Sequence, residues 1–406
     1  MLTDLVDERR LWDRHMAMAR FGATAAGGVN RQALSPEDAQ AQLQLVEWGA
    51  AIGLTAAHDA AGNLFLRWGG RDDTAPPVLS GSHLDSQPTG GRFDGVYGVL
   101  AALEAVEALH EAGFVPQRPI EIVAWMNEEG SRFAPGMMGS EAFSGERTLA
   151  EIGEARDAGG VSVEQALAQM PRLGTRALGG PVHAYLEAHI EQGPVLERVG
   201  VPLGVVTGIQ GKRTYTVTVS GEAAHAGTTE RADRRDALLA ACALVSALDA
   251  AIASRAPQAM FTVGRFNVTP NAPSVIAAQV QFSIDLRHRD SRTLAELARE
   301  LHKVCSAVHG PCTVALRELM AADPIEFDGG LRQLIARSAQ TLGVPAIDIY
   351  SAAGHDARPL SRVCPTAMLF VPCRAGISHN EAESAQPQDL AAGARVLAAC
   401  LAQLAG

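Results

Sequence analysis

Short apolar runs alternate with helical patterns through the first part of the chain. Apolar runs at residues 78–80 and 120–126 predict buried strands. Between them, apolar positions recur every three or four residues over 96–110, which predicts a helix that Gly113 can end. Strands that alternate with helices in this way form a mainly parallel sheet with helices on both faces. The pattern therefore predicts an α/β domain.

A different rhythm follows between about residues 212 and 320. Strands are predicted at 215–219, about 260–266, about 275–287 and about 312–317, and helices at about 233–254 and about 291–308. Their order, β-α-β-β-α-β, is that of a ferredoxin-like α+β unit. Along 279–287, apolar and polar residues alternate, which predicts one core face and one outward face. The core face carries Phe282, Ile284 and Leu286, and the outward face carries Gln281, Ser283, Asp285 and Arg287.

The α/β pattern resumes after about residue 322, with a helix predicted near 331–342 and a strand at 367–372. We therefore expect two domains, one of which is discontinuous. Residues 1–211 and 322–406 form the discontinuous domain, and residues 212–321 form a domain inserted between its halves.

Composition narrows the function classes. The chain has 406 residues, of which 47% are hydrophobic and 19% charged, and its formal net charge is -11. This length and apolar share can build cores in two or three domains, which excludes a disordered chain. The acidic balance, without a Lys/Arg-rich run, argues against nucleic acid as a partner. A small molecule is the expected target.

Three features bear on the compartment. The amino-terminal residues mix acids and bases and do not resemble an export signal. The longest apolar segment, 237–252, is interrupted by Ser246 and Asp249, which favours a buried core helix over a membrane span. The six cysteines are scattered and form no C-x-x-C pair, which is typical of free thiols in a reducing compartment. We expect a cytoplasmic protein without a membrane anchor.

Candidate chemistry begins where the strand at 78–80 ends. His83 and Asp85 follow this strand and Asp94 opens the next helix, and strand ends of this kind are where α/β sheets place ligands. Asp85 can accept the second ring N–H of a metal-bound His83 and so orient it for catalysis. The alternative is an ordinary surface pair. A run of glycines follows at 90, 91, 95 and 98, but it lacks the G-x-G-x-x-G spacing of a phosphate-binding loop.

Two adjacent carboxylates, Glu128 and Glu129, end the strand at 120–126. Both can ionise in a dry site only if a cation balances them. Adjacent side chains diverge in an extended chain, so one can bind metal while the other faces water as a general base. The alternative is a solvated pair at the start of a loop.

Three further histidines stand in comparable places. His189 and His379 lie beside or after apolar strands, as His83 does, and His225 lies in the inserted domain. Imidazole and carboxylate without a thiolate cluster suit zinc, manganese, cobalt or nickel, and the sequence leaves the choice open.

Together these blocks resemble the hydantoinase/carbamoylase branch of the dinuclear metallo-aminoacylase and carboxypeptidase superfamily. This branch includes N-carbamoyl-L-amino acid hydrolases, β-ureidopropionases and allantoate amidohydrolases. The likeness extends over nearly the whole chain, from R-F-G-A-T at 20–24 through D-A-A-G-N-L-F at 59–65 to G-I-S-H at 376–379.

The resemblance implies two divalent metal ions per subunit and a general base. Asp94 bridges the ions, His83 and His189 complete one of them, Glu129 and His379 complete the other, and Glu128 activates a water between them. A carboxylate stands at position 189 in the peptidase branches, so the histidine favours the carbamoylase branch. The resemblance also implies a cis peptide bond between Asp94 and Gly95.

The resemblance further implies a substrate site and a dimer. Arg287 matches the residue that grips the substrate carboxylate, and Gln192, Asn271, Gly354 and His355 match other substrate positions. His225 matches a histidine that stabilises the oxyanion, apparently from the partner subunit. The inserted domain is accordingly expected to serve as lid and as the surface of a homodimer.

Two departures from the family pattern concern the substrate. Ser274 replaces an asparagine that holds substrate in relatives, and Glu230-Arg231 stands where Pro-Met is usual. The main hypothesis is a metal-dependent amidohydrolase that cleaves the carbamoyl C–N bond of an N-carbamoyl-L-amino acid. Alternatives are an allantoate or ureidoglycolate amidohydrolase, an N-acyl amino acid amidase, and a non-catalytic ligand-binding homologue. A serine hydrolase is disfavoured because no G-x-S-x-G elbow is present.

Overall fold

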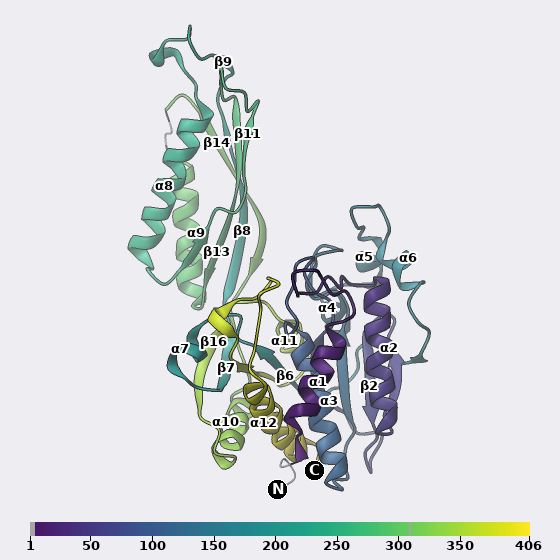
Figure 1. Ribbon diagram of the computed structural model, residues 1–406. Helices are drawn as coiled ribbons and strands as arrows, with labels where there is room; N and C mark the ends of the chain where they lie inside the picture. The colour runs from purple at the N-terminus through teal and green to yellow at the C-terminus, as the bar shows by residue number, and fades with distance from the viewer. Residues whose placement is uncertain (1–4, 308–309) are drawn as a thin grey trace. The chain divides into compact units, whose positions relative to one another are not determined.

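The computed structural model describes residues 5–307 and 310–406. The chain forms two compact units (Figure 1). Met1–Thr207 and Phe327–Gly406 make one unit, and Gly208–Glu326 make the other.

The larger unit is built on most of a ten-stranded sheet. In spatial order its strands are β7 (Leu203–Ile209), β17 (Thr366–Val371), β6 (Ala184–Ile190), β3 (Val78–His83), β4 (Ile120–Trp125), β2 (Leu64–Trp68), β1 (Thr55–His58) and β5 (Gly174–Thr175), with β16 (Ala346–Ser351) beside β7. The tenth strand, β15 (Ile325–Glu326), pairs with Gly208 and Ile209 at the end of β7, and these residues fall in the smaller unit. The central strands β17, β6, β3 and β4 are parallel, and most outer pairs are antiparallel. The predicted α/β class with a mainly parallel sheet is confirmed.

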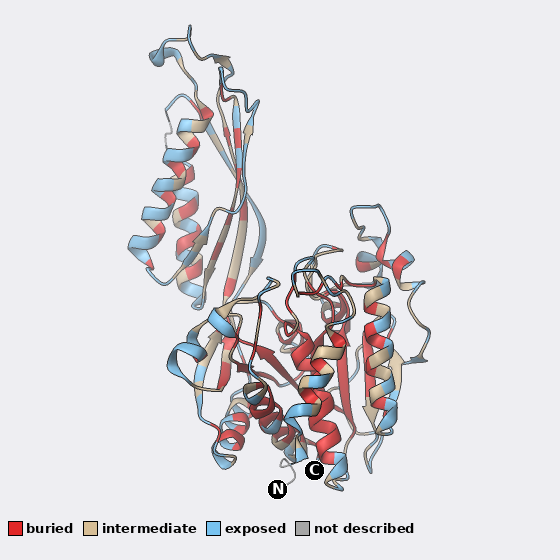
Figure 2. Cartoon of the chain, viewed as in Figure 1, coloured by how far each residue is buried: buried red, intermediate tan, exposed pale blue. Residues whose placement is uncertain are grey.

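Helices cover this sheet. They are α1 (Glu8–Met18), α2 (Pro36–Ala51), α3 (Val96–Glu111), α4 (Met138–Ser144), α5 (Leu149–Glu154), α6 (Val163–Leu167), α7 (Val195–Val199), α10 (Gly329–Thr341), α11 (Ala357–Leu360) and α12 (Pro387–Ala405), with a 3-10 turn at Arg374–Gly376. Helix α3 packs on β3, β4 and β6 beneath α1 and α12 and is buried on all sides, as the red ribbon in Figure 2 shows. Most of its residues are apolar, as suits a core helix, and its buried Glu104 is paired with Arg10 of α1 at 2.7 Å.

The smaller unit has the ferredoxin-like order. Its elements are β8 (Gly211–Ser220), β9 (Ala224–His225), a 3-10 turn (Arg231–Asp233), α8 (Ala237–Arg255), β10 (Met260–Thr262), β11 (Phe266–Thr269), β12 (Val275–Ile276), β13 (Gln279–His288), α9 (Ser291–Cys305) and β14 (Thr313–Ala322). The antiparallel sheet runs β10-β13-β8-β14, with β11 also on β13. Residue 308, the predicted end of the second helix, lies outside the described residues.

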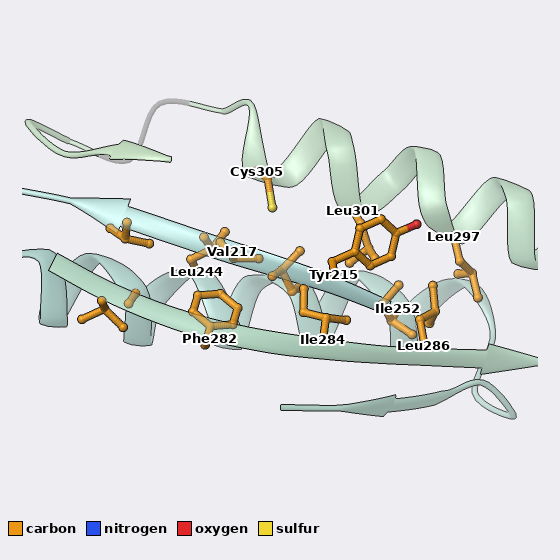
Figure 3. Packing of buried hydrophobic residues seen from close by; sticks show 14 of the residues in the cluster. Tyr215, Val217, Leu244, Ile252, Phe282, Ile284, Leu286, Leu297, Leu301 and Cys305 are labelled. Carbon is orange, nitrogen blue, oxygen red and sulfur yellow. The ribbon is translucent and has the colours of Figure 1, made fainter. Parts of the chain in front are cut away.

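The core of the smaller unit confirms the alternation along β13. Phe282, Ile284 and Leu286 are buried between this sheet and its two helices, where Figure 3 shows them facing Leu244 and Leu297. The alternate positions on β13 are partly or fully exposed.

Two predicted strands are each divided in the structure. The strand at 260–266 is split into β10 and β11, because five residues from Thr262 to Phe266 oppose four from Asp285 to Phe282, which makes a bulge. The strand predicted at 275–287 loses its first part to β12, which pairs with β9 in a separate two-stranded ribbon. Alternation alone gives no sign of either break.

Helix α8 is long and apolar enough, by length and composition, to cross a membrane. One stripe of it, Ala237, Ala241, Leu244, Leu248 and Ile252, is buried in the core of the smaller unit. Only this stripe of the helix is buried in the core. Residues on the other face are exposed, among them Leu239 at 62% exposure.

Candidate metal centre

Parallel strands bring the candidate residues to one edge of the large sheet. His83 is the last residue of β3, His189 lies near the end of β6, and Glu128 and Glu129 follow β4 in the next turn. Asp94 lies in the loop that leads into α3. Because the carboxyl ends of neighbouring parallel strands meet at the same edge, residues far apart in sequence become neighbours.

Asp94, His83 and His189 form one group of potential ligands. Asp94 Oδ1 lies 3.2 Å from His189 Nε2 and 3.8 Å from His83 Nε2. All three residues are buried, and their nearest ligand atoms lie within 4.8 Å of one another.

Asp94, Glu129 and His379 form a second such group. His379 Nε2 lies 3.3 Å from Asp94 Oδ2 and 3.3 Å from Glu129 Oε2. Asp94 therefore presents one carboxylate oxygen to each group. The five residues expected to bind metal lie together, in the two sets that the resemblance implies.

The histidine rings are oriented for metal binding. His83 Nδ1 lies 2.9 Å from the carbonyl oxygen of Asp85, and His189 Nδ1 lies 2.9 Å from that of Ile190. A ring that donates Nδ1–H to a carbonyl presents the lone pair of Nε2, and in both rings Nε2 faces Asp94. The donor set of imidazole nitrogens and carboxylate oxygens thus fits a divalent cation.

The pKa values of the centre are shifted by burial and by the close approach of its carboxylates and imidazoles. Burial, followed by repulsion from Asp356, Glu129 and other carboxylates, raises the pKa of Glu128 well above its usual range. Burial and the Asp94 charge raise the pKa of Glu129 to about 7. Burial opposes the charged form of His189, but contact with Asp94 raises its pKa to about 9. A divalent cation would reverse the repulsion and displace such protons.

The Asp85 carboxylate was expected to orient the His83 ring, and this expectation is wrong. The Asp85 carbonyl oxygen receives the ring contact, and its carboxylate lies 3.7 Å from His83 Nδ1. The carboxylate instead accepts the backbone N–H of Glu128 at 3.1 Å and that of Glu129 at 3.2 Å. Asp85 thus fixes the main chain that carries both glutamates.

Glu128 stands beside the first group without belonging to it. Its Oε2 lies 3.6 Å from His83 Nε2. Glu129 is held separately, because Gln87 Nε2 donates to its Oε2 at 2.8 Å. The two adjacent carboxylates therefore have different surroundings, as the divergence of neighbouring side chains predicts.

Of the expected substrate residues in the larger unit, Gln192 lies directly on the centre. Its Nε2 donates to Asp94 Oδ2 at 2.8 Å, and its buried Oε1 has no hydrogen-bond partner among the described residues. The ring of His355, in contrast, is buried against His189 at 4.6 Å between centroids and contacts Ser351 Oγ at 2.9 Å. Gly354, beside it, has no side chain and lies near Met137.

The remaining candidates, His225, Asn271, Ser274 and Arg287, lie in the smaller unit. His225 on β9 pairs with Val275 on β12, and the Ser274 carbonyl accepts the N–H of Ala226 at 3.0 Å. Asn271 has a positive φ of 57°. Arg287 lies on the polar face of β13, where its Nε and Nη2 contact Asp285 at 2.7 and 3.1 Å.

The peptide bond between Asp94 and Gly95 is trans, contrary to the expectation from the resemblance. Gly95 has a φ of +67°, so the glycine backbone itself makes the turn into α3. A Cβ at this position would overlap the His83 ring.

Several polar residues around the centre are missing from the sequence prediction. Glu187 accepts hydrogen bonds from Ser82, Tyr185 and the Ala357 amide. Asp356 is fully buried and accepts the Ser140 hydroxyl. Ser378 and Glu383 contact the Asp94 loop. Three of these residues lie close in sequence to predicted site residues, which is the one sign that the sequence offers of their role. Asp356 follows His355, and Ser378 and Glu383 flank His379.

The buried imidazoles and carboxylates at the carboxyl edge of an α/β sheet are those of a metal-dependent hydrolase fold. The chain belongs to the Peptidase family M20/M25/M40, whose family model matches residues 79–403.

Several similar proteins are named as amidohydrolases or amidases. An N-carbamoyl-L-amino-acid amidohydrolase of Rhizobium meliloti is 39% identical, over 97% of this chain and 95% of its own length. An allantoate amidohydrolase of Bacillus subtilis is 35% identical, over 96% of this chain and 95% of its own. The solved structure of a hydantoinase/carbamoylase family amidase from Burkholderia multivorans has a TM-score of 0.90 and 43% identity, covering 98% of each chain.

Proposed function

We propose that this protein is a metal-dependent amidohydrolase that cleaves the carbamoyl C–N bond of an N-carbamoyl-L-amino acid. The observation that carries this proposal is Asp94, which offers one oxygen to each of two ligand groups with Glu128 beside them. The name of the Rhizobium meliloti relative supports the substrate class. The site is proposed to hold two divalent ions, zinc, manganese, cobalt or nickel, with His83 and His189 on one and Glu129 and His379 on the other.

When bound, the two ions would polarise the carbamoyl carbonyl and acidify a water. Glu128 takes a proton from the attacking water and delivers it to the departing nitrogen of the amino acid. The water oxygen forms a bond to the carbamoyl carbon, and the C–N bond to the amino acid breaks. The carbamate released in this step yields carbon dioxide and ammonia. Asp85 holds the Glu128 main chain in place during this transfer.

The substrate residues are assigned by resemblance and chemistry. Arg287 would bind the substrate carboxylate, since its planar guanidinium already engages the Asp285 carboxylate with two nitrogens. The unpartnered Oε1 of Gln192 suits an N–H donor of the substrate. Asn271, Ser274, Gly354 and His355 are proposed to line the remainder of the site.

A homodimer formed through the smaller unit, which would also act as the lid, completes the proposal. His225 would stabilise the oxyanion in the partner's site. Strand β14 is ten residues long, largely exposed, and lies at the edge of its sheet, which makes it available for pairing. The scattered free thiols support a cytoplasmic location.

A mixture of two inactive variants tests the shared site. If His225 serves the partner's site, a heterodimer of His225→Ala and Glu128→Gln subunits has one complete site. Random mixing would then restore about a quarter of the wild-type activity in a two-fold dimer. Recovery of no activity, with heterodimers shown by mass measurement, would refute the shared site.

A substrate panel tests the activity. The ion-free protein is loaded in turn with zinc, manganese, cobalt and nickel, and ammonia release is measured with N-carbamoyl-L-amino acids, allantoate, ureidoglycolate and N-acetyl amino acids. We expect the highest kcat/KM with an N-carbamoyl-L-amino acid. Allantoate is the second candidate, because the Bacillus subtilis relative is named for it and Ser274 alters the substrate loop. No turnover of any ureido acid with any of the four metals would overturn the proposal.

A further inference from the structure

Glu383 connects the two loops that carry Asp94 and His379. Its Oε1 accepts the backbone N–H of Phe93 at 2.8 Å and that of Asp94 at 3.1 Å. Glu383 is itself only 4% exposed and lies four residues after His379. One buried carboxylate thus fixes the main chain at Asp94 from the segment that bears His379.

Ser378 extends this contact to the Asp94 side chain. Ser378 Oγ lies 2.6 Å from Asp94 Oδ2 and 3.1 Å from Glu383 Oε2. Asp94 Oδ2 is the oxygen that faces His379. The contacts of Glu383 therefore lie on the side of Asp94 that belongs to the second ligand group.

The glycine run that fails as a phosphate loop makes room for this contact. A Cβ on Gly91 would fall within the Glu383 carboxylate, and a Cβ on Gly28 would meet Glu381 and the Gly90 carbonyl. Both glycines therefore allow the segment after His379 to pack closely on the Asp94 loop. Any larger residue at position 91 would push Glu383 away from the Phe93 and Asp94 amides.

Asp85 makes an equivalent contact elsewhere in the centre. Its carboxylate accepts the consecutive amides of Glu128 and Glu129, as that of Glu383 accepts those of Phe93 and Asp94. Glu129 is thus held by other contacts than those of Glu383, whereas two of the three members of its group, Asp94 and His379, lie on the two segments that Glu383 joins. The first group shares only Asp94 with this arrangement.

We propose that Glu383 is a positioning residue that sets the affinity of the ion held by Asp94, Glu129 and His379 more than that of the ion held with His83 and His189. This proposal rests on the two-ion centre of the proposed function. Residues that orient metal ligands in this way typically contribute about 10- to 100-fold to metal affinity.

Cobalt titration of the ion-free full-length protein measures both affinities. A chelator competes for cobalt, and the visible spectrum of the bound ion reports each site. His379→Ala and His83→Ala identify which binding step belongs to which group. Glu383→Ala should then weaken the step lost in His379→Ala by about 10- to 100-fold and the other step several-fold less. Gly91→Ala should produce the same selective loss.

Two controls separate positioning from folding. Glu383→Gln keeps an acceptor oxygen for both amides and should bind both ions within about threefold of wild type, against the 10- to 100-fold loss on removal of such a group. Glu104→Ala removes another wholly buried glutamate, paired with Arg10 at 2.7 Å, and should lower the melting temperature without changing either cobalt affinity.

The outcomes are distinct. Wild-type affinity for both ions in Glu383→Ala, or equal weakening of both, would overturn the positioning role. Wild-type affinity for both ions in Gly91→Ala would also overturn it. A wild-type protein that takes up fewer than two cobalt ions would refute the two-ion centre itself.

Discussion

Replacing Glu128 by glutamine removes the proposed general base and little else. The backbone N–H of Glu128 donates to Asp85 at 3.1 Å, and this contact does not involve the Glu128 side chain. The amide has nearly the same shape as the carboxyl group, so the chain should keep its course. Glu128 also belongs to neither ligand group, so both ions should remain bound.

The expected loss follows from the role of a base. General acid–base catalysis contributes about 10²- to 10⁴-fold to rate. At about 1.36 kcal/mol per factor of ten, this corresponds to about 3 to 5 kcal/mol of activation free energy. We therefore expect kcat of Glu128→Gln to fall by about 10²- to 10⁴-fold with little change in KM.

Ammonia release from an N-carbamoyl-L-amino acid, with the metal content measured on the same sample, provides the assay. Glu129→Gln is the matched control, because the neighbouring carboxylate should lose an ion together with activity. Wild-type kcat in Glu128→Gln would refute the base assignment. Loss of an ion from Glu128→Gln, as from Glu129→Gln, would refute the division of roles between the two glutamates.

Three further predictions concern substrate binding and stability. Arg287→Ala should raise KM about 10- to 100-fold for substrates with a carboxylate, by loss of a charged hydrogen bond, and an equal loss on carboxylate-free ureas would contradict this role. Burial lowers the pKa of His15 to about 3, so the folded state holds it neutral while the unfolded chain takes up a proton below about pH 6.5. The stability contributed by His15 is thus present above pH 6.5, and by pH 5 it has fallen by about 2 kcal/mol. The free energy of unfolding of His15→Phe, measured in urea, should lack this decline. The same pH dependence in the variant as in wild type would contradict the assignment of the decline to His15. Phe282→Ala should cost about 3 to 5 kcal/mol, because Phe282 is wholly buried on Phe266, and a cost below about 1 kcal/mol in urea unfolding would contradict this packing.

Sequence periodicity located the residues of the centre because each stands beside a regular element. His83 and Glu128 lie within three residues of the ends of apolar runs, and Asp94 precedes a helical repeat. Strand order cannot be read from such runs, but neighbouring parallel strands end at one edge of a sheet. The resemblance then supplied the division into two ligand groups, which the positions of His189 and His379 match.

The supporting contacts could not be predicted in this way. Glu383 acts on the amides of Phe93 and Asp94, 290 and 289 positions away in the chain, and backbone amides have no identity in a sequence pattern. Asp85 shows the same limit, because an H-x-D spacing allows either its carbonyl or its carboxylate to face the histidine. The bulge between β10 and β11 likewise depends on the partner strand.

An anomalous-difference map from crystals of the cobalt-loaded protein would show whether the centre holds two ions. Two peaks are expected about 3.5 to 4 Å apart, one in contact with His83 and His189 and the other with Glu129 and His379. Asp94 should contact both peaks with separate oxygens. A single peak, or two peaks of which only one touches Asp94, would contradict a two-ion centre bridged by Asp94.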